Sequence, residues 1–175
     1  VEFMAALMTS EMGNQEKLLK YVSCCKDMDI DVVRPSVNDS QRSFSAKDGK
    51  VVFGLGGIKN VGDEAIREIL DARASGAYAS LYDLCLRVNL RKVTKRVLES
   101  LIKGGACDCF GTSRAALLAA LEITVARAQK RARDKASNQV SLLAMTPLAE
   151  TPPEPGIGFD CPEAGMPEMD EAEKL

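Results

Sequence analysis

The sequence contains no histidine, and none of its six cysteines belongs to a C-x-x-C pair. Zinc sites are built mainly from these two residue types, so we expect no metal site and no cofactor in this chain. The sequence also lacks a signal peptide and any apolar run near the roughly 20 residues that span a bilayer. These absences exclude a membrane-spanning protein or a membrane partner, and they predict a cytoplasmic location with reduced cysteines.

The length of the chain limits its functions. Its 175 residues, 46% of them hydrophobic, are enough for one or two small domains but few for a multidomain enzyme. The chain begins within an apolar stretch and ends in a charged one, so both ends read as cut from a longer protein. We therefore expect a piece of a larger protein rather than a complete enzyme.

Charge is distributed unevenly along the chain. The formal net charge is only -2, which by itself does not favour a nucleic-acid partner. Residues 91–135, however, hold eleven Lys or Arg against four acids, a local balance of +7, and residues 150–175 hold eight acids against one lysine. Because electrostatic potential decays over roughly 10 Å at ordinary salt, the local charge decides the partner. The basic segment is therefore a candidate for binding an anionic polymer.

Helical spacing of apolar residues predicts a mainly α fold interrupted by one small β-hairpin. The first 30 residues read as two helices broken at Gly13, with Asn14 as the cap of the second. Residues 43–53 form two β-prone runs around Asp48-Gly49, which is the signature of a type I′ turn. The hairpin is thus expected between the helices of the first 30 residues and those that follow.

The second half of the chain is predicted to be helical up to about Ala136. Four helices are expected there, beginning near Asp63, Ser80, Val93 and Thr112. Beyond them the periodicity stops, and six of the seven prolines lie in residues 147–175. We interpret this acidic, proline-rich tail as an extended or disordered linker.

Two segments, 54–62 and 101–106, suggest a helix, a tight glycine hairpin and a second helix. Glycine lets the backbone turn sharply and approach a phosphate, and the following helix N-terminus adds positive potential. Each hairpin carries a lysine, Lys59 or Lys103. The alternative is that both are ordinary helix C-caps, but the pair favours tandem helix-hairpin-helix motifs that bind the DNA backbone without reading sequence.

The candidate DNA surface consists of cations and hairpin residues. For the cations of residues 91–96, the alternative is that they only form a solvated helix face. The candidate residues are Gly56, Gly57, Lys59, Asn60, Gly62, Arg91, Lys92, Lys95, Arg96, Lys103, Gly104 and Gly105. The basic run over 127–135 either extends this surface or keeps its helix soluble. Binding through such cations is expected to weaken steeply with salt.

A short peptide after the long helix is the other candidate for binding. Gln139-Val140-Ser141-Leu142-Leu143 combines a polar anchor with two large apolar side chains. Such a peptide suits a preformed groove on a protein partner. The alternative is that Leu142 and Leu143 pack back on the long helix.

Three segments, 1–11, 53–62 and 90–106, resemble consecutive segments of the bacterial DNA polymerase III alpha subunits. The resemblance extends to about residue 143, in the family's order and approximate spacing. It implies that residues 1–50 are the end of the fingers region, 51–111 the helix-hairpin-helix domain for duplex DNA, and 112–146 a basic helix with the sliding-clamp peptide. Residues 147–175 would lead toward an oligonucleotide-binding-fold domain.

The same resemblance implies partners and limits. Duplex DNA, the sliding clamp and other subunits of the replicase would be the partners, with Gln139 to Leu143 on the clamp. Family versions of the clamp peptide often end in phenylalanine, and Leu143 departs from that pattern. The family's palm, with the aspartates that hold its catalytic metal, implied to be Mg²⁺, has no counterpart here, so no polymerase activity is expected from this chain alone.

Two other functions remain open from the residues. A helix-hairpin-helix module of a DNA repair nuclease or ligase would account for the hairpins equally well, although not for residues 1–50 or the clamp-like peptide. A helical scaffold that binds only protein, through its acidic tail, would account for the helices. Salt-sensitive binding to duplex DNA distinguishes the scaffold from the two DNA-binding functions.

Overall fold

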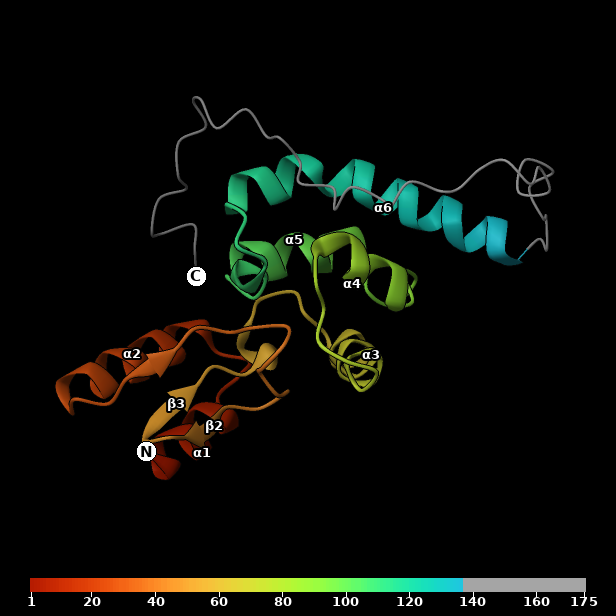
Figure 1. Ribbon diagram of the computed structural model, residues 1–175. Coiled ribbons are helices and arrows are strands. Elements are labelled where there is room, and N and C mark those ends of the chain that lie inside the picture. The colour runs from red at the N-terminus through yellow and green to blue at the C-terminus, as the bar shows by residue number, and fades with distance from the viewer. Residues whose placement is uncertain (137–175) are drawn as a thin grey trace.

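The computed structural model describes residues 1–136, in which helices dominate and one small sheet lies near the N-terminus (Figure 1). The α-helices are α1 (Glu2–Ser10), α2 (Gln15–Asp27), α3 (Asp63–Arg73), α4 (Leu81–Arg87), α5 (Lys95–Lys103) and α6 (Arg114–Ala136). Two 3₁₀ turns, η1 (Leu55–Gly57) and η2 (Asp108–Phe110), precede α3 and α6. The predicted mainly α fold is confirmed, while the linker predicted for 147–175 lies outside the described residues. Within those residues, no helix has the length and hydropathy needed to cross a bilayer.

Helix starts follow from capping side chains. The Asn14 carboxamide accepts a hydrogen bond of 3.1 Å from the backbone N–H of Lys17 at the start of α2. The Ser80 hydroxyl accepts one of 3.1 Å from the backbone N–H of Asp83, whose carboxylate in turn accepts from the N–H of Ala79. Each cap satisfies N–H groups that have no partner within the helix. Both predicted caps are confirmed.

The sheet consists of β1 (Val32–Val33), β2 (Ser45–Lys47) and β3 (Lys50–Val52), in the order β1-β3-β2. Strands β2 and β3 are antiparallel, with Lys47 opposite Lys50. Between them Asp48 has φ 50° and Gly49 has φ 75°, as a type I′ turn requires. The predicted hairpin is confirmed, and β1 adds a parallel partner to β3 that the local pattern did not predict.

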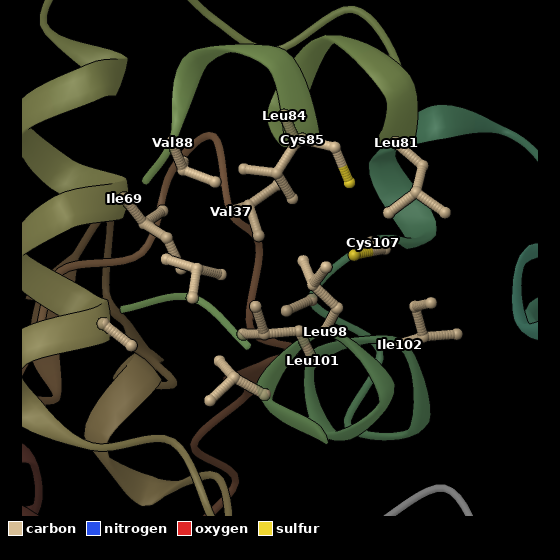
Figure 2. Close-up of a cluster of buried hydrophobic side chains, with 14 of the residues drawn as sticks. Val37, Ile69, Leu81, Leu84, Cys85, Val88, Leu98, Leu101, Ile102 and Cys107 are labelled. Carbon is tan, nitrogen blue, oxygen red and sulfur yellow. The ribbon is translucent and has the colours of Figure 1, made fainter. Parts of the chain in front are cut away.

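The buried apolar side chains of the described residues form two cores. The first joins α1, α2 and the sheet around residues such as Met8, Cys25 and Val51. The second joins α3, α4, α5 and α6. Figure 2 shows buried side chains of α3, α4 and α5 converging on one interior. The two cores interleave along the chain, since Val37 belongs to the second core while Phe44 and Val51 belong to the first. The domain boundary after residue 50 stays a prediction.

Most cysteines of residues 1–136 pack in these cores as free thiols. Cys24, Cys25, Cys85, Cys107 and Cys109 are free, and Cys25, Cys85 and Cys107 are buried. Burial raises the pKa of Cys85 to about 12, because an apolar interior disfavours the thiolate. These buried thiols therefore act as small apolar groups.

A close backbone contact joins the first core to the turn that follows it. The backbone N–H groups of Leu55 and Gly56 donate to the carbonyls of Gln41 and Arg42, each at 2.9 Å. Gly54 lies directly against this segment, and a Cβ there would be 2.5 Å from the carbonyl carbon of Ser43. Only glycine allows the two backbone segments to lie this close.

Gly54→Ala is therefore expected to lower the free energy of unfolding by about 1–3 kcal/mol, since backbone must move to admit the methyl group. The measurement is guanidinium denaturation followed by circular dichroism. Gly13→Ala is the matched control, because a Cβ at Gly13 meets no atom within 4 Å. Equal stability of the two variants would show that the 41–43 segment is not held against Gly54.

Candidate nucleic-acid interface

The first glycine hairpin, residues 58–62, connects η1 to α3. The segment before it is a single 3₁₀ turn following β3, rather than the α-helix that the sequence pattern suggested, because Gly54 to Gly57 must turn tightly against residues 41–44. Within the hairpin Asn60 has φ 64°. Asparagine is among the few non-glycine residues that adopt this conformation readily. The hairpin is therefore as tight as one with glycine at this position.

The backbone of this hairpin has donors available for a ligand. In the described part of the chain, no internal acceptor is paired with the N–H groups of Lys59, Asn60, Gly62 or the first three residues of α3. Gly62 is the N-cap of α3, has no capping side chain and is open to solvent. Exposed N–H groups at a helix N-terminus, together with the helix dipole, form an anion-binding arrangement.

The second hairpin is built differently. The N–H of Ala106 donates to the carbonyl of Leu101 at 2.9 Å, and the N–H of Gly105 donates to that of Ile102 at 3.0 Å. With Gly105 at φ 81°, this is the Schellman motif that ends α5. The N–H of Gly104 also bonds within the helix, to Ser100. Here the backbone donors are used internally, so a ligand would be contacted through the Lys103 side chain.

The two hairpins lie side by side. A Cβ on Gly104 would be 3.1 Å from Cγ2 of Ile58, so the second hairpin touches the first. At the opposite end of α5, the Arg96 guanidinium donates to the Asn60 carboxamide oxygen at 3.4 Å. The structure therefore brings both hairpins and both ends of α5 to one region of the surface.

The candidate cations fall into two groups. Lys59, Arg91, Arg96 and Lys103 are exposed, and no carboxylate in residues 1–136 lies within ion-pairing distance of them. Lys92 lies 3.3 Å from Glu68 of α3, and Lys95 lies 3.2 Å from Glu122 of α6. Exposed pairs of this kind are weak, but each partly neutralises its lysine. The first group therefore has the more available positive charge.

The first turn of α5 carries positive charge where the helix dipole disfavours it. Lys95 and Arg96 follow the N-cap Thr94, and no acid is present in that turn. Acids, by contrast, occupy the first turn of α3, at Asp63 and Glu64. Positive side chains at a helix N-terminus stabilise the helix poorly but add to its attraction for anions. The first turn of α5 is therefore more electropositive than that of α3.

Three arginines were not among the residues singled out from the sequence. Arg114 donates to the Asp108 carboxylate at 2.8 and 2.6 Å and to the carbonyl of Lys103 at 2.9 Å, so it holds α6 against the second hairpin. Arg67 is exposed one turn into α3. Its spacing of four residues from Asp63 can be read from the sequence, because residues four apart share a face of a helix. Arg42 is the third, and no local pattern connects it with the hairpin.

Arg42 forms a two-point ion pair with Asp63, through Nε and a terminal nitrogen, each at 2.8 Å from a carboxylate oxygen. Hydrogen bonding to this guanidinium lowers the pKa of the Asp63 carboxyl below its usual value. The carboxylate next to the open N-terminus of α3 is therefore ionised and locally compensated.

Two candidate regions lie beyond this surface. The Lys and Arg residues of the basic run over 127–135 are exposed along α6. The peptide Gln139 to Leu143 lies outside the described residues. Among residues 1–136, no cluster of three or more His, Cys, Asp or Glu is placed to hold a metal ion.

A sequence model of the helix-hairpin-helix motif matches residues 29–117, and the chain belongs to this family. The chain is also similar to DNA polymerase III subunit alpha from several bacteria. It is 41% identical to the *Vibrio cholerae* protein over 155 residues, which are 87% of this chain. It is 40% identical to the *Escherichia coli* K12 protein over 86% of the chain and 39% identical to the *Helicobacter pylori* protein over 79%. The chain spans 12–13% of the length of these relatives.

Proposed function

We propose that this chain binds the backbone of duplex DNA without sequence specificity, as part of a replicative DNA polymerase III alpha subunit. One observation supports it above the others: the unpaired N–H groups of Lys59, Asn60, Gly62 and the first turn of α3 lie beside cations that have no acidic partner within residues 1–136. Backbone amides and lysines contact phosphate oxygens, and such contacts position a protein on DNA without reading bases. The twelve candidate residues of the sequence analysis contribute unequally to this surface.

The two hairpins have different roles in this proposal. The first supplies N–H groups and the Lys59 side chain, while the second supplies Lys103 and holds the first in place through the contact of Gly104 with Ile58. Arg96, at the start of α5, holds the first hairpin by donating a hydrogen bond to Asn60. Gly105 and Gly104 then serve the shape of the surface rather than direct contact with phosphate.

The similarity to polymerase subunits supports the wider part of the proposal. The whole protein would be a DNA-directed DNA polymerase of the cytoplasm that uses Mg²⁺, and this chain would supply duplex binding but no catalytic residue. Gln139 to Leu143 would contact the sliding clamp, and other replicase subunits would bind elsewhere. The relatives compared above are polymerase subunits, so they favour this function over a repair nuclease or ligase.

A salt-dependent titration tests the proposal. Fluorescent primer-template duplex is titrated with the chain at about 50 and 200 mM salt, beside a single strand of the same sequence. We expect preference for duplex and an affinity that falls by tenfold or more across this range, as for a surface that contacts several phosphates. Binding that is equal for both substrates, or insensitive to salt, would contradict backbone recognition of duplex DNA.

A further inference from the structure

A carboxylate stands beside the anion-binding N-terminus of α3. Asp63 is the first residue of that helix, next to Gly62, whose N–H is open to a ligand. An acid here favours the helix, because it interacts well with the dipole, but it also repels a phosphate that approaches the same N–H groups. A surface that binds DNA requires this charge to be cancelled.

Arg42 is placed to cancel it. Its guanidinium bonds both oxygens of Asp63 at 2.8 Å, and its backbone carbonyl accepts the N–H of Gly56 at 2.9 Å. Arg42 thus contacts the chain on both sides of the first hairpin, although it lies in the loop before β2. Its side chain can be changed without removing the backbone contact.

The second acid of the same turn has a similar partner. Lys92 lies 3.9 Å from Glu64 and 3.3 Å from Glu68. The acids in the first turn of α3 are therefore each paired with a cation from another segment of the chain. The Arg42–Asp63 pair has the better geometry, since two parallel N–H···O bonds fix both groups.

The pair contributes little to stability. Arg42 is 45% exposed and Asp63 is 55% exposed, so solvent screens their attraction. The main effect of so exposed a pair is therefore on the electrostatic potential at the first hairpin, and its effect on the stability of the loop is smaller.

We propose that Arg42 is a positioning residue for DNA binding: it neutralises Asp63, so that the N–H groups of the first hairpin and α3 can donate hydrogen bonds to a phosphate. This inference rests on the proposed function. It predicts opposite effects for the two members of the pair, because removing Arg42 exposes a negative charge and removing Asp63 frees a positive one. A purely structural pair would give losses of the same sign.

The test is a double-mutant cycle in duplex titrations at about 50 and 200 mM salt. Arg42→Gln is expected to weaken binding about threefold at the lower salt and by less at the higher salt, because salt screens the uncompensated charge of Asp63. Asp63→Asn is expected to tighten binding about threefold, and the double variant is expected to return close to the unsubstituted chain. Arg42→Lys keeps the charge and is expected to retain most of the affinity.

The outcomes separate this inference from the proposed function. Denaturation of each variant by urea establishes that it is folded. If the unsubstituted chain binds duplex and requires Lys59 and Lys103, but both single variants weaken binding without rescue in the double variant, the compensating role of Arg42 is overturned alone. If the unsubstituted chain binds no duplex, the proposed function fails and this inference fails with it.

Discussion

Replacing Lys59 and Lys103 together with alanine is expected to lower the affinity for duplex DNA by tenfold or more at about 50 mM salt. Both side chains are exposed, and neither has a carboxylate partner within the described part of the chain. No acidic side chain therefore competes with a phosphate for either ammonium group. The loss of two contacts reduces the slope of log affinity against log salt by about 1.8.

The control is a double variant with the same change in net charge. Lys20 on α2 and Lys47 in β2 are also exposed lysines, but they lie outside the two glycine hairpins and α5. Lys20→Ala with Lys47→Ala is expected to change affinity by less than about twofold, since potential from distant charges is screened at this salt. Equal losses in the two double variants would show that net charge, and not the hairpin surface, binds DNA.

Several elements were predictable because their signals are local. The cap at Asn14, the turn at Asp48-Gly49 and the start of α6 after Ser113 each depend on residues within one turn of the chain. Their backbone conformations are favoured by a single side chain or by glycine. Such local preferences need no knowledge of the rest of the fold.

Other features depend on contacts between distant segments. The pairing of β1 with β3 joins residues about twenty positions apart, and Arg42 meets Asp63 across 21 positions. The difference between the two hairpins also arises this way: a glycine-rich segment looks alike whether its N–H groups are free or, as at Gly105, bonded within a Schellman motif. The sequence therefore identified the hairpins but could not say which one exposes its backbone.

The candidate cations illustrate the same limit. Lys92 and Lys95 belong to the same basic run as Arg91, yet the structure pairs both lysines with acids of neighbouring helices. Charge density along the chain predicts that a surface is basic. The positions of α3 and α6 in the fold determine which cations of this basic run are paired with acids and which are not.

The stability of the surface depends on α5, which carries Arg96 near one end and Lys103 at the other. Leu98 lies between them with 0% of its surface exposed and packs in the core shown in Figure 2. Leu98→Ala is expected to lower the free energy of unfolding by about 2–5 kcal/mol, because it removes buried apolar surface and leaves a cavity among helices that cannot fully close. The measurement is urea denaturation followed by circular dichroism.

Leu19→Ala is the matched control, since Leu19 is 49% exposed on α2 and its truncation removes little buried surface. Its effect is expected to stay within about 0.5 kcal/mol, as for most surface substitutions. Below its denaturation midpoint, Leu98→Ala is expected to keep the salt slope of DNA binding, because the same cations remain on the folded surface. A loss for Leu98→Ala no larger than that of the control would show that α5 is not anchored in the core, and the two hairpins would then lack the rigid support that holds them side by side.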